Sequence, residues 1–324
     1  MITWKDLPFV SDIIDLPVDL SDIGGFRKPE ELLPLMDFVL NGVTAWKEVA
    51  EYVYLLNVDD PYSFFSVLRE QKWIFYGCVL TGPFNLIFMS YQPVDLSHVK
   101  GYNYTVKSGI RSNYYVPEIV EKDYDTAYNN ILKRCEGKIE SSIFEIALKD
   151  FKWTEELWSL YCDLKYDLRI DFTPLVKKYG FKNTTFYERV KNLLQNTDVY
   201  VPFYPLEERS YQFFYFLFKT DYQKFVADCF GELPVSTTHI RVKDSLLSYV
   251  PVPYGGEREH FLNIISLWER KGIIGSHDTS IPYFSDLINT QPGIPLPAPP
   301  VPSQSGVNPP DGKRKTGRER MYSI

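Results

Sequence analysis

The stretch DFTPLVKKYGFKNTTFYERVKNLLQN, residues 171–196, decides most of what can be expected of this chain. Its apolar residues recur at the spacing of two short helices, and Gly180 lies between them. Glycine adopts a positive φ without steric cost, so it is typical of a tight interhelical turn. Asn183 or Thr184 is expected to cap the second helix. The stretch therefore predicts a helix-turn-helix whose shared core is formed by Leu175, Val176, Tyr179, Phe186, Val190, Leu193 and Leu194.

The remaining side chains of this stretch should face outward, and most are cationic or polar. Between Phe172 and Gln195 there are five cations and one acid, whereas the whole chain has a formal net charge of −7. Local positive charge attracts phosphate, and Arg or Asn on the second helix reads base edges in the major groove. We expect Arg189 and Asn183 to contact bases, the lysines to contact phosphates, and Tyr187 to touch a sugar or a thymine methyl. The candidate DNA-binding residues are Lys177, Lys178, Lys182, Asn183, Thr184, Thr185, Tyr187, Arg189 and Lys191.

The region after the helix-turn-helix has the order of a ferredoxin-like domain. From Ser210 onward, runs rich in β-branched and aromatic residues alternate with amphipathic segments. The predicted order is strand, helix, strand, strand, helix, strand, which is the split βαβ arrangement. The aromatic run SYQFFYFLFKT, residues 210–220, favours a buried strand over a base-stacking surface.

The first half of the chain repeats this order less clearly, which indicates an internal duplication. Helices are predicted over 30–42, 45–53 and 61–71, and strands over 72–80 and 84–94. The three helices correspond to a degenerate helix-turn-helix, whose acidic third helix should repel phosphate.

These patterns predict an α+β protein with a winged helix-turn-helix and a ferredoxin-like (βαββαβ) domain, duplicated in tandem and followed by a disordered tail. The tail is rich in proline and then basic, so it cannot bury enough apolar surface to order itself. The predicted segments are an N-terminal extension (1–30), the degenerate helix-turn-helix-like copy (31–80), a first α+β half (81–150), the winged helix-turn-helix (151–208), the ferredoxin-like effector and oligomerisation domain (209–287) and the tail (288–324).

The segment LVKKYGFKNTTFYERVKNL, residues 175–193, resembles the helix-turn-helix of the Lrp/AsnC family of transcription regulators. Val176 and Pro174 replace the alanine and the acidic residue usual in that family. The following stretch LPVSTTHIRVKDS, residues 233–245, resembles the second strand of the family's effector domain. The matching helix-turn-helix positions are Leu175, Gly180, Thr185, Arg189, Val190 and Leu193.

The resemblance implies a regulator that binds double-stranded DNA and an archaeal origin, since such regulators are common in archaea. Proteins of the family pair two chains and bind small ligands between their effector domains. This sequence shows no matching ligand-contact pattern, so the effector is unknown. An internal duplication would let one chain form an intramolecular pseudo-dimer in place of a homodimer.

Two other functions fit the same sequence. The net charge and the acidic first copy favour a scaffold whose helix-turn-helix binds a protein partner in place of DNA. Siroheme decarboxylases also resemble Lrp/AsnC proteins, and their chemistry uses His and Arg residues. Here His239 and Arg241 alternate with Ile240 on a predicted strand, so they should share one face.

Other residue types narrow the choice of function. Four cysteines, which form no C-x-x-C pair, are expected to be buried free thiols and not zinc ligands. The histidines lack ligand spacing, and no catalytic triad is evident. We therefore expect no metal, no cofactor and no enzymatic activity. The chain start lacks a secretory signal, and the most apolar window, residues 73–91, is interrupted by Gly and Pro. These features predict a cytoplasmic protein without a membrane span.

Overall fold

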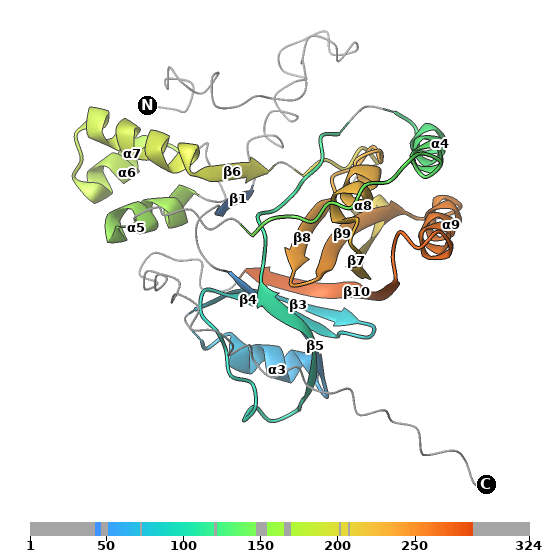
Figure 1. The fold of residues 1–324 in the computed structure, drawn as a ribbon. Helices are drawn as coiled ribbons and strands as arrows, with labels where there is room; N and C mark the ends of the chain where they lie inside the picture. The colour runs from blue at the N-terminus through green and yellow to red at the C-terminus, as the bar shows by residue number, and fades with distance from the viewer. Residues whose placement is uncertain are drawn as a thin grey trace.

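The computed structural model describes residues 43–46, 51–71, 73–119, 122–146, 154–164, 170–200, 202–206 and 208–287. Helices surround an eight-stranded antiparallel sheet, so the expected α+β class is confirmed (Figure 1). The predicted N-terminal extension and C-terminal tail lie outside the described residues. In their order across the sheet, the strands are β5 (Tyr102–Ile110), β2 (Tyr52–Val58), β4 (Leu86–Ser90), β3 (Ile74–Thr81), β10 (Ser276–Leu287), β7 (Tyr211–Lys219), β9 (Ser245–Pro253) and β8 (Thr238–Val242).

Strands β10, β7, β9 and β8 form what we call the C-terminal half-sheet. Along the chain they alternate with helices α8 (Gln223–Phe230) and α9 (Glu257–Arg270) as strand, helix, strand, strand, helix, strand. In the sheet, the fourth strand lies beside the first, and the third lies between the first and the second. This is the ferredoxin-like arrangement that the sequence predicted. Both helices cover the outer face of the half-sheet (Figure 1).

The aromatic run of β7 is buried on both faces. Phe214, Phe216 and Phe218 pack on the helix side, whereas Tyr215 and Leu217 face the opposite side of the sheet. This alternation follows from the two-residue period of a strand. The run is therefore core, as the sequence favoured.

Strands β5, β2, β4 and β3 form what we call the N-terminal half-sheet, and they repeat the same relative order. Helix α3 (Pro61–Leu68) joins β2 to β3 and covers the outer face. No helix occupies residues 91–101 between β4 and β5, all of which the structure describes. The next helix, α4 (Tyr124–Arg134), packs instead against α8 and α9 of the C-terminal half.

The prediction of a helix-turn-helix-like copy over 31–80 is wrong in the part that the structure describes. Residues 52–81 form β2, α3 and β3, so the helix predicted over 61–71 and the strand predicted over 72–80 agree with the structure, whereas residues 45–46 and 52–53 of the predicted second helix lie in strands. Val53 and Leu55 face the other half-sheet, while Tyr54 and Leu56 pack toward α3. A strand buried on both faces has a continuous apolar run that local periodicity does not separate from a helix. The helix predicted over 30–42 lies outside the described residues.

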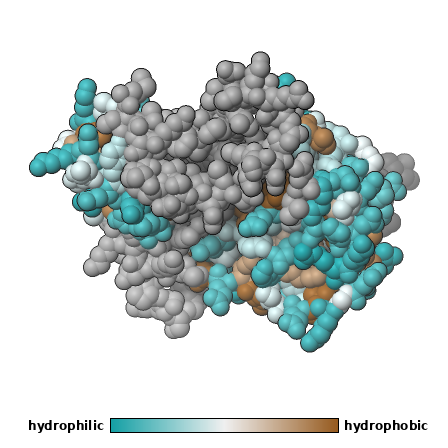
Figure 2. Space-filling view, turned by 90° about the horizontal axis from the view of Figure 1, so that it is seen from above, coloured by the Kyte–Doolittle hydropathy of each residue, from teal (hydrophilic) through white to brown (hydrophobic). Residues whose placement is uncertain are grey.

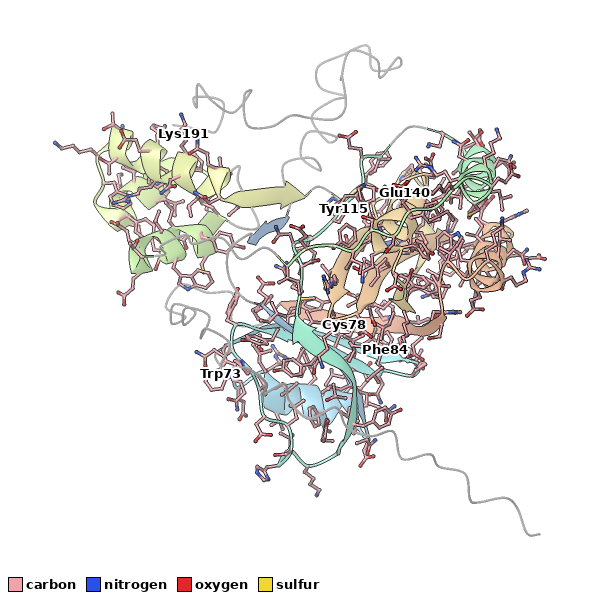
Figure 3. All side chains as sticks on the ribbon, in the orientation of Figure 1. Trp73, Cys78, Phe84, Tyr115, Glu140 and Lys191 are labelled. Carbon is pink, nitrogen blue, oxygen red and sulfur yellow. The ribbon has the colours of Figure 1, made fainter. Side chains whose placement is uncertain are left out.

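The two half-sheets enclose a common interior. The edges of β3 and β10 pair, and at the other end Arg111 and Tyr115 bridge to Val242 and His239 of β8. These contacts close the eight strands on themselves. The hydroxyl groups of Tyr76 and Tyr215 lie 2.7 Å apart across the interior. The buried interior residues, which include the Cys78 and Phe84 labelled in Figure 3, are Val53, Leu55, Cys78, Leu80, Phe84, Ile87, Met89, Tyr215, Leu217, Ile240, Val242 and Leu247.

A buried ion pair lies where the ring of strands closes. Arg111 Nη2 lies 2.5 Å from Glu51 Oε2, and both side chains are at most 4% exposed. The Arg111 guanidinium also stacks over Tyr114, with 4.0 Å to the ring centroid, and Nη1 donates to the Ser112 carbonyl at 2.7 Å. The pair connects the start of β2 to the segment that pairs with β8.

Substitution Glu51→Gln should destabilise the fold strongly. It removes the carboxylate and leaves the Arg111 charge buried, which costs about 3–5 kcal/mol of unfolding free energy. Denaturant titration measures this loss. The matched control is Glu140→Gln, which breaks the Lys138–Glu140 pair, whose side chains are 86% and 78% exposed. That control should change the free energy by less than about 1 kcal/mol. Equal effects of the two substitutions would contradict the assignment.

Candidate nucleic-acid interface

The predicted helix-turn-helix is present and comprises three helices, α5 (Glu155–Leu164), α6 (Phe172–Tyr179) and α7 (Asn183–Gln195). Leu175 of α6 and Phe186, Val190 and Leu193 of α7 are buried in one cluster, so these predicted core positions are confirmed. Trp158 of α5 belongs to the same cluster and meets Tyr91, which follows β4, edge to face at 5.6 Å. This contact fixes the helical unit against the N-terminal half-sheet.

The turn between α6 and α7 has the geometry that glycine favours. Gly180 has φ +64° and ends α6, with its amide donating to the Lys177 carbonyl at 3.3 Å. The Phe181 amide donates to the Val176 carbonyl at 3.2 Å. Asp171 caps the start of α6 by accepting from the Thr173 amide at 2.9 Å. Both ends of α6 are therefore fixed by local hydrogen bonds.

The expected cap of α7 by Asn183 or Thr184 is wrong. Lys182 occupies the N-cap position, and no side chain caps the helix there. Asn183 and Thr184 lie one and two positions further on, inside the first turn, so neither has the extended backbone of a cap. Both side chains are exposed. The exposed first turn leaves their polar groups, and the amides of that turn, facing solvent.

The predicted DNA-binding residues divide into two groups by exposure. The stripe Thr184, Glu188, Lys191 and Gln195 forms the most exposed face of α7, and Figure 3 shows Lys191 on the side away from the sheets. In the view from above, the described surface around these helices, at the left, is mostly hydrophilic (Figure 2). The exposed candidates are Lys177, Lys178, Lys182, Asn183, Thr184 and Lys191, and the half-buried ones are Thr185, Tyr187 and Arg189.

Two of the cations are held by acids of α5. Arg189 Nη2 lies 3.6 Å from Glu156 Oε2, and both side chains are about 40% exposed (39% and 41%). Lys178 Nζ lies 2.7 Å from Asp163 Oδ2, which also accepts from the Tyr179 hydroxyl at 2.6 Å. Burial, and then the hydrogen bond to Asp163, raise the pKa of Tyr179. These ion pairs hold the two cations close to α5.

The strand that follows α7 pairs with a strand from the start of the described chain. β6 (Thr197–Tyr200) begins directly after α7 and runs antiparallel to β1 (Val43–Trp46). β1 precedes β2 as β6 precedes β7, so equivalent strands of the two halves pair with each other. The two-stranded sheet beside the helix-turn-helix thus contains one strand from each half of the chain.

His239 and Arg241 share the face of β8 that the sequence predicted, but both are engaged in structural contacts. The His239 ring is fully buried and stacks on Phe230 at 5.4 Å, with its two nitrogens 2.9 Å from Thr237 Oγ1 and Ser248 Oγ. Burial lowers the pKa of His239 to about 3. Arg241 Nη1 donates to the Phe144 carbonyl at 2.8 Å. The two side chains thus anchor β8 against its surroundings.

Other features bear on the kind of site. Within the described ranges, no cluster of three or more His, Cys, Asp or Glu residues has the arrangement to bind a metal ion. No helix in the part of the chain that the structure describes combines the length and apolar character required to cross a bilayer. All four cysteines are buried thiols, as the sequence predicted.

Comparisons with known proteins give the following. No protein-family model and no curated protein matches the sequence. The chain is similar to a crystal structure of the siroheme decarboxylase NirDL, with 10% identity, a TM-score of 0.43 and coverage of 79% of both chains. A second structure, of NirDL in co-complex with an iron-uroporphyrin III analogue, has 9% identity, a TM-score of 0.43 and coverage of 81% of this chain and 82% of that one. At this TM-score we infer neither activity nor ligand, and the fold class stands on the strand order itself.

Gly180→Val should weaken the helix-turn-helix. A Cβ at this position meets no atom within 4 Å, so any cost comes from φ alone. A β-branched residue resists positive φ, and we expect a loss of about 1–3 kcal/mol in unfolding free energy. Gly180→Asn is the control, since asparagine tolerates this conformation and should lose less. Equal losses measured by denaturant titration would rule out the conformational explanation.

The buried His239 should make stability depend on pH. Its pKa in the folded protein lies below the unfolded value of 6.5. Between these two pH values the unfolded chain binds a proton at His239, whereas the folded protein does not. Stability is thus complete above pH 6.5 and falls by up to about 1.4 kcal/mol per pH unit below it. His239→Gln should remove this component. The test is the difference in unfolding free energy between wild type and variant from pH 7 to about pH 4; a constant difference would contradict it.

Proposed function

We propose that this chain is a transcription regulator that binds double-stranded DNA by placing α7 in the major groove. The observation that carries the proposal is the helix-turn-helix itself, which extends to one side of the strands with its second helix exposed (Figure 1). A helix with an exposed polar face fits the width of the major groove. The Gly180 turn and the buried core between α6 and α7 hold this helix rigidly.

The distribution of polar groups supports the same geometry. Asn183 and Thr184 lie at the start of α7, where a reading helix commonly meets base edges. Lys177 and Lys178 end α6, and Lys182 precedes α7, so three cations lie around the turn. Cations in this position contact phosphates and set the register of the helix on the duplex. The more buried Thr185 and Tyr187 would then contact the duplex from the edges of α7.

Arg189 requires one rearrangement to read a base. In the structure its guanidinium is held by Glu156, but that pair is exposed and such pairs contribute less than about 1 kcal/mol. A bidentate contact to guanine contributes about 1–3 kcal/mol, so it outweighs the pair. We propose that Arg189 leaves Glu156 when DNA binds.

Selection of duplexes from a random DNA pool tests the proposal. Wild-type protein should enrich one motif, and Arg189→Ala should weaken binding to it by about 1–3 kcal/mol and relax its preference. Lys182→Ala should weaken binding to all sequences and reduce the salt slope by about one unit. An asymmetric motif would indicate one reading helix per complex, and a palindrome would indicate two chains.

Two variants serve as controls for that selection. Glu156→Gln frees Arg189 and should leave the motif affinity unchanged or higher. Lys138→Ala removes a cation that is 86% exposed and lies outside the helix-turn-helix, so it should change nothing. No enriched motif with wild type, or unchanged binding by Arg189→Ala, would contradict DNA reading through α7.

A protein-binding scaffold is the second candidate, and Glu188 is the observation that favours it. This acid lies in the exposed stripe of α7 between Thr184 and Lys191, where it would face phosphates or bases. The chain's net charge of −7 acts in the same direction. A partner protein that binds the wild type and is lost on Glu188→Ala, with no DNA motif enriched, would favour this function.

The contacts of His239 and Arg241 support a siroheme decarboxylase less than the helix-turn-helix supports a DNA-binding protein. His239 is fully buried, and both of its ring nitrogens are within hydrogen-bonding distance of neighbouring hydroxyls. A general acid or base must reach the proton that it transfers. Arg241 donates to two backbone carbonyls, those of Phe144 and Lys243. Neither side chain is placed to meet a substrate without moving.

A further inference from the structure

Two cysteine thiols from distant parts of the chain meet beneath α4. Cys135 ends α4, and Cys229 lies on α8, so the pair joins the segment that follows β5 to the C-terminal half. Both are buried in one cluster with Trp268, whose Nε1 donates to Cys135 Sγ at 3.3 Å. Cys135 and Cys229 also lie close enough for each thiol to shift the pKa of the other.

The two thiols are held in unequal environments. The hydrogen bond from Cys229, the Trp268 N–H and the charge of Lys271 lower the pKa of Cys135 to about 7. The same thiol–thiol hydrogen bond and burial raise the pKa of Cys229. Cys135 is therefore the nucleophilic member, since the thiolate and not the thiol attacks electrophiles.

A cavity borders Cys135. It has a volume of about 320 Å³, and Cys135, Tyr222, Lys271 and Ile273 are among its lining residues. The Lys271 ammonium donates to the Cys135 carbonyl at 3.0 Å, so a cation lies at the cavity wall. A space of this size admits several molecules as small as water.

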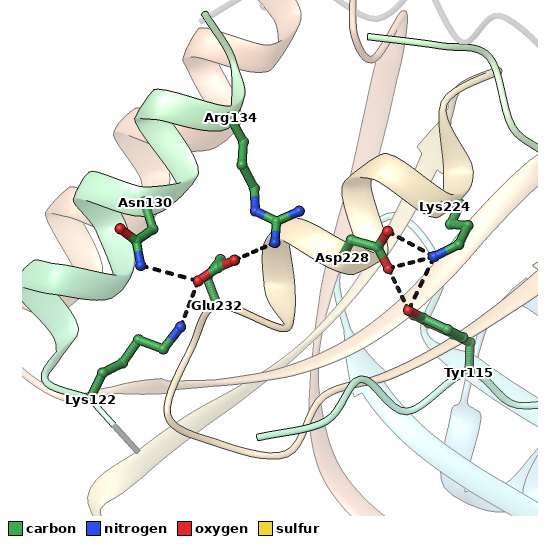
Figure 4. Close-up of polar contacts among 7 residues, drawn as sticks. All are labelled: Tyr115, Lys122, Asn130, Arg134, Lys224, Asp228 and Glu232. Carbon is green, nitrogen blue, oxygen red and sulfur yellow. Dashed lines mark hydrogen bonds and ion pairs between the residues drawn. The ribbon is translucent and has the colours of Figure 1, made fainter. Parts of the chain in front are cut away.

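Two polar networks hold α4 and its flanking segment against α8 (Figure 4). The first centres on Glu232, which accepts from Lys122 at 2.5 Å, from Arg134 at 2.5 Å and from Asn130 at 3.2 Å. In the second, Asp228 accepts from Lys224 at 2.8 Å and from the Tyr115 hydroxyl. The first network holds α4, which Cys135 follows, against the end of α8, and the second holds the segment at Tyr115 against α8, which carries Cys229.

We propose that Cys135 and Cys229 form a dithiol that hydrogen peroxide oxidises to an intramolecular disulfide. The Cys135 thiolate attacks one peroxide oxygen, the O–O bond breaks, and the leaving hydroxide takes up a proton as water. Cys229 then attacks the sulfenic sulfur, the S–S bond forms, the S–O bond breaks, and the departing oxygen leaves as a second water with the Cys229 proton. Two thiols are oxidised and one peroxide is reduced. The disulfide locks α4 covalently to α8.

The experiment treats the full-length protein with excess hydrogen peroxide, blocks remaining thiols and identifies cross-linked peptides by mass spectrometry. We expect a peptide pair joined through Cys135 and Cys229, released again by dithiothreitol. Cys78 lies in the interior of the strands, where burial raises its thiol pKa to about 12, so it should react at least about tenfold more slowly. This measurement on the wild type requires no variant to fold.

Variants then assign the two roles. Cys229→Ser should stop the reaction at the Cys135 sulfenic acid, which dimedone labels, and Cys135→Ser should leave Cys229 unoxidised. Cys78→Ala and Cys162→Ala are controls that should still form the disulfide. Consumption of Cys78 or Cys162 before Cys135, or peroxide treatment that yields no Cys135–Cys229 peptide, would overturn the proposal.

Discussion

The apolar contact between the inner faces of the two half-sheets is the constraint on which the fold depends. Helices cover only the outer face of each half-sheet, so the inner faces have to cover each other. Residues such as Val53, Leu55, Leu217 and Leu247 lie in this shared interior, and burying a side chain of this kind contributes about 1.5–3 kcal/mol. The N-terminal half-sheet has α3, but the described residues 91–101 between β4 and β5 form no second helix. The two halves therefore form one folding unit, and the helix-turn-helix is attached to it through Trp158 and Tyr91.

Local patterns predicted the parts of the fold whose partners are near in sequence. The Gly180 turn, the α6–α7 core and the strand order of the C-terminal half all follow from spacing and turn chemistry. β2 did not, because α3 and the opposing half-sheet bury its two faces, and a helix and a doubly buried strand then look alike in sequence. Local patterns also could not predict the position of α4, because that position depends on contacts with Glu232, about a hundred residues later in the chain.

The candidate interface, too, could be predicted from the sequence only in part. Helical periodicity predicted the exposed side chains of α7 only in part, because Asn183, Thr184 and Lys191 are exposed whereas Thr185, Tyr187 and Arg189 are half-buried. It did not place Arg189 beside Glu156 or Lys178 beside Asp163, because the rotation of α5 relative to the other two helices is set by packing. The cap of α7 was missed for a smaller reason. Asn183 and Thr184 have the side chains of a cap, but the chain enters the helix one residue earlier, at Lys182.

The closure of eight strands within one chain also has a thermodynamic consequence. Two half-sheets that pair as separate molecules do so in proportion to their concentration, and dilution separates them. Here covalent connection makes the pairing unimolecular, so dilution does not weaken it. The bridges from Arg111 and Tyr115 to β8 also occupy part of a sheet edge at which strands of another copy could add, which limits edge-to-edge aggregation of a chain so rich in tyrosine and phenylalanine.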